Sequence, residues 1–242
     1  ATVDIPAAFL QQDWDHKDEC YIRFDGVMVD MLLKICPEYA PCVKVGRSGQ
    51  RTMIAKLKKA IYGTLLAARI FYDKLRSFLE SDGFEVNPYD ECTFNKVMNN
   101  NQCTIQFHVD DLMISHVDIS CIETCMEKLN NEFGKIKPLQ AVYGQVHEYL
   151  GLTIDFSNPK EVKFTMYDYL EDILEESKGD MKGLARTPAA DNLFKVDPDC
   201  EKLNEDDGDY FHRMTARLLY ASKRARPDLQ TAVSFLCKRV KS

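Results

Sequence analysis

Apolar and polar residues alternate along several short segments of the chain, which is the pattern of half-buried β-strands. The clearest case is the segment from Cys103 to Val117, which contains the adjacent acids Asp110 and Asp111. We expect two strands here, with Phe107 and Val109 on the side that faces the core. Four other segments have a strand-like pattern: Thr2 to Leu10, Tyr21 to Phe24, Glu148 to Asp155 and Lys163 to Met166.

Other segments repeat their apolar residues at intervals of three and four, which predicts amphipathic helices. This spacing runs from Ile54 to Leu79, and a further helix is expected after Ser120, which forms a capping-box pattern with Glu123. Strands and helices mix without regular alternation, so the fold class is α+β, with an antiparallel sheet packed on helices. Three helices are expected in the last third of the chain: Tyr169 to Glu176, Tyr210 to Arg224 and Pro227 to Val240.

The pair Asp110 and Asp111 places two negative charges between two apolar runs. Alternation assigns Asp110 to the polar face of its strand and Asp111 to the tight turn. Asp4 lies on the polar face of its own strand, so it can converge with Asp110 if the two strands are neighbours. Carboxylates brought together repel one another, and a divalent cation such as Mg²⁺ relieves that repulsion. The alternative is an ordinary Asp-rich turn, as we interpret Asp206-Asp207, and the pair alone favours that alternative.

Charge is distributed unevenly in a chain of otherwise ordinary globular composition. The 242 residues are 45% hydrophobic and 29% charged, with a net charge of -7. From Lys44 to Arg76 there are nine basic residues and one acid, and from Arg213 to Lys241 there are eight basic residues and one acid. Phosphate binding depends on the local field, so these two basic blocks are candidate nucleic-acid contacts despite the net negative charge. A solvated basic helix face is the alternative.

Targeting and redox signals are weak. No run approaches the roughly 18 apolar residues of a membrane span, and the start lacks a signal-peptide pattern. We therefore expect an intracellular protein, in a cytoplasmic particle or the nucleus, with no membrane partner. The chain begins without Met and directly in a strand-like pattern, which suggests a fragment of a longer reading frame. The nine cysteines include no Cys-x-x-Cys pair, so reduced thiols are favoured over a zinc site.

Several short motifs follow one another in a fixed order along the chain. They are Asp4 with Ala8, Phe9 and Leu10; Tyr62-Gly63 with Ala67, Arg69, Phe71 and Tyr72; His108-Val109-Asp110-Asp111; Tyr149-Leu150-Gly151; Thr187-Pro188; and Arg226-Pro227-Asp228. In their order and spacing these motifs resemble those of the reverse transcriptases of copia-type retrotransposons. Each motif alone is weak evidence, but together they cover nearly the whole chain. They favour a metal site at Asp110 and Asp111 over an ordinary Asp-rich turn.

The resemblance implies a fold and an activity. It implies a polymerase palm with partial fingers over residues 1–156 and a helical thumb-like region over 157–242. The implied activity is RNA-directed DNA polymerisation by two-metal nucleotidyl transfer, with Mg²⁺ or Mn²⁺ as cofactor. The implied partners are a primed RNA or DNA template and deoxynucleoside triphosphates.

The resemblance also implies roles for single residues. Asp4 and Asp110 would be metal ligands and Asp111 a supporting carboxylate, all three catalytic. Phe9, Gly63 and Arg69 would bind the nucleotide, Phe9 as the gate that rejects a 2′-hydroxyl. The remaining implied roles are a proton donor at Lys135 or Lys137, a primer grip at Tyr149 to Thr153, and template contacts in the basic block 44–76.

The chain departs from the family pattern in three ways. His108 stands where the family has Tyr, and the helix motif that starts at Gly63 lacks the Lys, Gln and Pro that the family holds there. The family's fingers segment precedes the motif of Asp4 and is not part of this sequence. Two other functions therefore stay open: a catalytically inactive, truncated or decayed remnant that retains at most nucleic-acid binding, and a nucleic-acid-binding module that rests on the basic blocks.

Overall fold

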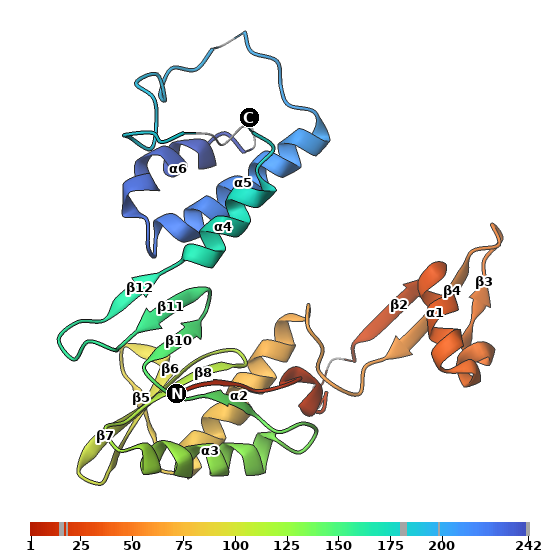
Figure 1. Cartoon of the computed structure of the whole chain (residues 1–242). Helices are drawn as coiled ribbons and strands as arrows, with labels where there is room; N and C mark the ends of the chain where they lie inside the picture. The colour runs from red at the N-terminus through yellow and green to blue at the C-terminus, as the bar shows by residue number, and fades with distance from the viewer. Residues whose placement is uncertain (15–16, 18, 180–182, 198, 241–242) are drawn as a thin grey trace. The chain divides into compact units, whose positions relative to one another are not determined.

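The computed structural model describes residues 1–14, 17, 19–179, 183–197 and 199–240. The chain forms two compact units, Ala1–Val142 and Tyr143–Ser242 (Figure 1). The division falls before the expected boundary at residue 156, because the sheet of the first unit ends at Val142 and the next strands form a sheet of their own. Within the described part of the chain, no helix is both long enough and apolar enough to cross a membrane.

A six-stranded antiparallel sheet forms the body of the first unit. Its strand order is β5-β6-β7-β8-β1-β9, so the first strand of the chain lies between two strands that come more than 100 residues later. The expected α+β class, with an antiparallel sheet, is confirmed. The strands are β1 (Thr2–Asp4), β5 (Glu85–Asn87), β6 (Asp90–Met98), β7 (Asn101–His108), β8 (Asp111–Ser115) and β9 (Gln140–Val142).

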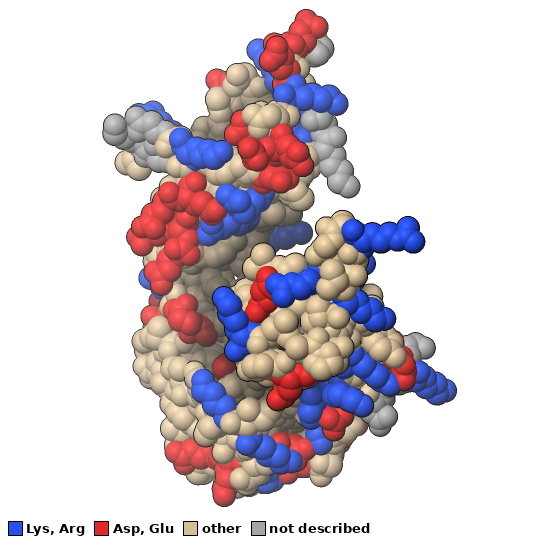
Figure 2. Space-filling model, turned by 90° about the vertical axis from the view of Figure 1, so that its right-hand side faces the viewer, with Lys and Arg blue, Asp and Glu red and all other residues tan. Residues whose placement is uncertain are grey.

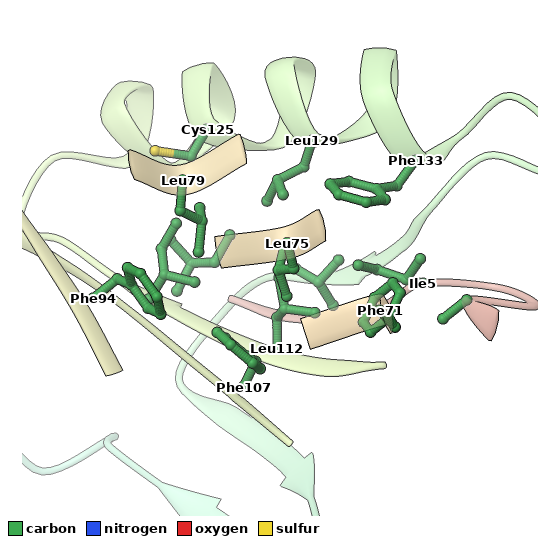
Figure 3. Close-up of a cluster of buried hydrophobic side chains, with 14 of the residues drawn as sticks. Ile5, Phe71, Leu75, Leu79, Phe94, Phe107, Leu112, Cys125, Leu129 and Phe133 are labelled. Carbon is green, nitrogen blue, oxygen red and sulfur yellow. The ribbon is translucent and has the colours of Figure 1, made fainter. Parts of the chain in front are cut away.

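Two helices, α2 (Leu65–Ser81) and α3 (Ile119–Phe133), pack on one face of this sheet. Figure 3 shows their apolar side chains meeting those of the strands. On α2 every fourth residue is buried, and on β7 every second residue is buried, as expected from the two periodicities. The core residues labelled in Figure 3 are Ile5, Phe71, Leu75, Leu79, Phe94, Phe107, Leu112, Cys125, Leu129 and Phe133.

A smaller antiparallel sheet of order β2-β4-β3 belongs to the same unit. It accompanies helix α1 and the 3-10 helix η2, whereas the 3-10 helix η1 contacts α2 (Figure 1). The bounds of these elements are η1 (Phe9–Gln11), β2 (Tyr21–Asp25), α1 (Val27–Ile35), η2 (Pro37–Cys42), β3 (Lys44–Val45) and β4 (Arg51–Lys56).

The second unit contains a three-stranded antiparallel sheet, β10-β11-β12, followed by helices. The hydroxyl of Tyr220 on α5 donates to the carbonyl of Leu150, which joins the helices to this sheet. The expected helical C-terminal part is confirmed. The elements are β10 (Val146–Tyr149), β11 (Leu152–Asp155), β12 (Lys163–Thr165), α4 (Tyr167–Glu176), α5 (Glu205–Ser222), η3 (Pro227–Leu229) and α6 (Gln230–Cys237).

The long helix expected from Ile54 is wrong in its first third. Arg51–Lys56 is a strand, because it pairs with β2 on one side and with β3 on the other. The helix begins only at Leu65, after Gly63, whose backbone φ of +91° is incompatible with an α-helix. A repeat of apolar residues cannot distinguish the two structures when the pairing partners are distant in sequence.

Three further expectations need correction. The first strand ends at Asp4 and not at Leu10, since Phe9 already belongs to a 3-10 helix. Helix α3 is capped by Asp118, whose carboxylate accepts from the backbone N–H of Ser120, so Ser120 is not the cap. The expected single strand from Glu148 to Asp155 is a hairpin, because Leu150 and Gly151 both have positive φ and form a tight turn between β10 and β11.

Strands β5 and β6 were not expected from the sequence. Phe94 is the only residue of β6 that is fully buried, so this strand lacks the alternation that marks β7. It is held by pairing on both sides instead, to β5 and to β7. Its position inside the sheet is therefore a consequence of its neighbours and not of a local pattern.

Candidate active site

The hairpin of β7 and β8 closes at the pair His108 and Asp111. Its two-residue turn is therefore Val109 and Asp110, so both expected positions are wrong: Asp110 lies in the turn and not on a strand, and Asp111 is the first residue of β8. Val109 has a φ of +60°, which is strained for a β-branched residue and costs on the order of 1–3 kcal/mol. The tight turn holds Asp110 at the tip of the hairpin and leaves Asp111 on the sheet.

Strand β1 brings Asp4 to this hairpin. Asp4 lies directly opposite Asp111 in the antiparallel register, and the backbone N–H of Ile5 donates to the carbonyl of Asp110 at 3.0 Å. Two carboxylates directly opposite one another on adjacent strands are destabilising. Burial raises the pKa of Asp111, and the charges of Asp110 and Asp4 raise it further, while His108 on the other side lowers it. The structure thus gathers the three carboxylates that the sequence analysis selected.

Tyr62 also belongs to this cluster. Its hydroxyl donates to Oδ2 of Asp110 at 2.7 Å, and its ring lies 4.4 Å from the ring of Phe9, centroid to centroid. The hydrogen bond to Asp110 raises the pKa of Tyr62 to about 12, and burial and the charges of the three carboxylates contribute to the same shift. Tyr62 is part of the Tyr-Gly motif, but the motif alone predicts no role for its side chain.

The carboxylates do not form a ready-made cage for a metal ion. Among the residues that the structure describes, no three His, Cys, Asp or Glu side chains are arranged so that they hold a metal ion. The donor set is nonetheless of the right chemistry, since Mg²⁺ prefers oxygen ligands and commonly takes one or two carboxylates together with substrate phosphates. Burial is the main cause of the raised pKa of Asp111, and the repulsion from Asp110 and Asp4 that adds to it is the second observation that fits a cation.

Two of the expected nucleotide-binding residues lie beside the carboxylates. Phe9 is buried, with 6% of its surface exposed, and packs between the rings of Tyr62 and Phe71. Gly63 follows Tyr62 directly, and no protein atom lies within 4 Å of the position that a Cβ would take. A side chain at Gly63 would therefore be opposed by its positive φ and not by a clash within the chain.

The other expected site residues make contacts of their own. Arg69 donates to Asp73, one helical turn along α2, at 2.9 Å. Lys135 pairs with Glu132 at 3.3 Å and lines a cavity of about 450 Å³ at the end of α3. Lys137 is exposed beyond that helix. None of these contacts involves the carboxylate cluster, so the roles of these three residues stay predictions.

The basic block from Lys44 to Arg76 is largely neutralised by ion pairs. Figure 2 shows carboxylates interspersed with basic side chains on the face that it presents. The basic members of these pairs are exposed to solvent, which screens each pair, so phosphates can compete for the basic side chains at little cost. Lys241 of the second block lies outside the described residues. Six of the nine basic residues have an acidic partner: Arg51 with Asp30, Lys56 with Glu19, Lys59 with Asp13, Arg69 with Asp73, Lys74 with Glu132, and Arg76 with Glu80.

The raised pKa of Asp111 predicts that this carboxylate opposes folding. At a pH below its ordinary pKa, a carboxyl of this kind is neutral in the folded and the unfolded protein and costs no stability. As the pH rises through the raised pKa of the folded state, the carboxyl becomes charged and the folded protein loses stability. We expect Asp111→Asn, without divalent cations, to raise the free energy of unfolding by about 0.2–1 kcal/mol at pH 7. Urea unfolding measures this change.

The gain from Asp111→Asn should disappear below the ordinary carboxyl pKa of about 3.9, where the wild-type side chain is neutral as well. Asp155 is a control of opposite sign, because hydrogen bonds from Ser157 lower the pKa of its carboxyl. Asp155→Asn should give no gain at pH 7. An equal gain at pH 7 and at low pH would contradict the role given to the charge of Asp111.

A comparison with known protein families identifies the class of protein. Residues 40–188 match the family model of the reverse transcriptase (RNA-dependent DNA polymerase). This match covers more than half of the chain, so the chain belongs to the reverse transcriptase family. The resemblance that the motifs indicated is confirmed.

Curated relatives are distant and come from transposons. The chain is 26% identical over 197 residues to the retrovirus-related Pol polyprotein from transposon TNT 1-94 of Nicotiana tabacum, covering 79% of this chain. It is 21% identical over 186 residues to the putative transposon Ty5-1 protein of Saccharomyces cerevisiae, covering 76% of this chain. The matched region spans 14% of the tobacco protein and 57% of the yeast protein.

Among solved structures, apo telomerase from Candida tropicalis is similar at a TM-score of 0.39 and 12% identity. The match covers 99% of this chain and 40% of the telomerase chain. A likeness of this size is too weak to assign a fold.

Proposed function

We propose that this chain is the palm, with partial fingers, and the thumb-like region of an RNA-directed DNA polymerase from a copia-type retrotransposon polyprotein. The observation that carries the proposal is the meeting of Asp4, from β1, with Asp110 and Asp111, from a hairpin that is distant from β1 in the sequence. A structural turn would not require a third carboxylate from β1. The substrates would be deoxynucleoside triphosphates and a primed RNA or DNA template.

Asp4 and Asp110 would hold the divalent cations, Mg²⁺ or Mn²⁺, with Asp111 as the supporting carboxylate. When bound, such ions stabilise the attacking and leaving oxygens of phosphoryl transfer. The carboxylates supply the negative charge that selects a cation, and the hairpin turn fixes the position of Asp110 relative to β1. The carboxylate charges are therefore in place before the substrate binds, so the site needs little reorganisation during the reaction.

The remaining roles follow from the family pattern and are part of the proposal. Phe9 would pack against the sugar and reject a 2′-hydroxyl, Gly63 would let the backbone approach the templating pair, and Arg69 would contact the nucleotide. Lys135 or Lys137 would donate a proton to the leaving pyrophosphate. Residues 1–156 would serve as palm with partial fingers, including a primer grip at 149–153, and residues 157–242 as thumb.

The test is extension of a DNA primer on an RNA template, with and without Mg²⁺ or Mn²⁺. The protein is assayed as this chain and also joined to the segment that precedes it in its own reading frame. Cation-dependent incorporation of deoxynucleotides by either form supports the proposal. If neither form extends the primer, the proposed polymerase function is wrong.

The alternative is a chain that binds nucleic acid without catalysis. The lost Lys, Gln and Pro of the helix motif that starts at Gly63 favour it, as does the absence of a three-ligand metal group among the described residues. It predicts salt-dependent binding of RNA or DNA that survives when Asp4 and Asp110 are both changed to Asn, together with no extension.

A further inference from the structure

Tyr62 makes two contacts that bear on the proposed site at the same time. Its hydroxyl donates to Oδ2 of Asp110, and its ring lies against Phe9, the proposed sugar gate. The side chain is 55% exposed, so it is not held by burial in the core. A partly exposed tyrosine that touches both a proposed metal ligand and the proposed sugar gate stands where substrate would approach.

The hydroxyl of Tyr62 also occupies an electrostatic position that suits a cation. The charges of Asp110, Asp4 and Asp111 all act on it, so it lies within reach of the whole cluster. A hydrogen-bond donor directed at a carboxylate offsets part of the cost of bringing like charges together. A divalent ion at Asp110 would provide the same compensation more strongly, and would compete with the hydroxyl for the same carboxylate.

Tyr62 lies in a connecting segment and is not enclosed by a helix or strand of its own. The residue lies in the segment between β4 and α2, next to Gly63, which has no protein atom within 4 Å of its Cβ position. Thr64 closes the segment by donating from Oγ1 to the carbonyl of Ile61 at 3.0 Å. Tyr62 is not part of the buried core that packs α2 on the sheet, so loss of its contacts with Asp110 and Phe9 would not require that core to change.

We propose that Tyr62 is a latch that closes the carboxylate cluster when no cation is bound. The hydroxyl satisfies Asp110 in the cation-free state, and a cation at Asp110 displaces it. The departing ring uncovers Phe9, so that cation binding and exposure of the sugar gate are coupled. The latch rests on the proposed function, because it takes Asp110 as a cation ligand and Phe9 as a nucleotide contact.

The test measures Mn²⁺ binding and does not depend on activity. The dissociation constant is obtained by electron paramagnetic resonance of free Mn²⁺, at one pH and up to millimolar concentrations, with the full chain. Tyr62→Phe keeps the ring on Phe9 and removes only the hydroxyl. Because a hydrogen bond contributes a net 0.5–1.5 kcal/mol, this variant should bind Mn²⁺ about two- to thirteenfold more tightly than wild type. Tyr89→Phe, at a tyrosine that is 97% exposed, should leave the affinity unchanged.

Asp110→Asn, alone and combined with Tyr62→Phe, distinguishes a failure of the latch from a failure of the proposed cation site. Tighter binding in Tyr62→Phe that is lost in the double variant supports the latch. Binding that depends on Asp110 but is unchanged or weaker in Tyr62→Phe overturns the latch alone, and weaker binding would mean that Tyr62 positions Asp110 as a ligand. Binding that is insensitive to Asp110→Asn overturns the cation site of the proposed function and the latch with it.

Discussion

Asp110→Asn is expected to reduce cation-dependent primer extension on the order of a thousandfold, in whichever form of the protein shows extension. Asn keeps the shape of the side chain and an oxygen that can accept from Tyr62, so the turn is retained. It lacks the negative charge, which the proposed mechanism requires for a cation. The rate of incorporation under single-turnover conditions measures the loss.

A matched control for Asp110→Asn is available in the second acidic pair. Asp206→Asn removes the same charge from the exposed first turn of α5, where the carboxylate favours the helix N-terminus by less than about 1 kcal/mol. Extension by this variant should equal that of wild type. If Asp110→Asn retains wild-type extension, Asp110 is not a metal ligand of a polymerase site.

Leu75→Ala is expected to lower the free energy of unfolding by about 2–5 kcal/mol. Leu75 is completely buried at the centre of α2, between α3 and the sheet (Figure 3). The loss combines the transfer energy of the removed carbons with the cavity that the rigid neighbours leave behind. Urea unfolding, followed by circular dichroism, measures it.

Leu65→Ala provides the same chemical change on the same helix with the opposite burial. Leu65 is the first residue of α2 and is 96% exposed, so its truncation should change the free energy of unfolding by no more than about 0.5 kcal/mol. Similar losses in the two variants would mean that α2 does not pack on the sheet as described.

The elements that alternation governs could be predicted from the sequence. Along β7, Ile105 and Phe107 are buried while Gln106 and His108 are exposed, because a strand with one covered face must separate its residues in this way. The selection of Asp4, Asp110 and Asp111 followed from the motif order, and the structure brings all three together. Their catalytic and metal-binding roles stay predictions.

Other parts depended on partners that no local pattern reveals. The segment from Arg51 to Lys56 has apolar spacing that fits a helix, and only the strands on either side of it decide otherwise. The place of Asp111 in the site follows from the register of β8 with β1, which a one-residue slip would have reversed. Tyr62 was missed as a site residue because its hydrogen bond to Asp110 spans 48 residues.

The position of β1 inside the sheet has a consequence for the growing chain. Strand β1 pairs with β8, where Asp4 lies opposite Asp111, and its other neighbour, β9, is synthesised later still. At a translation rate of about 5–20 residues per second, Asp4 waits roughly 6–20 s after leaving the ribosome's catalytic centre before its partner strand exists. During that interval β1 has no partner strand to pair with. The carboxylate cluster is therefore among the last features of this unit to form during synthesis.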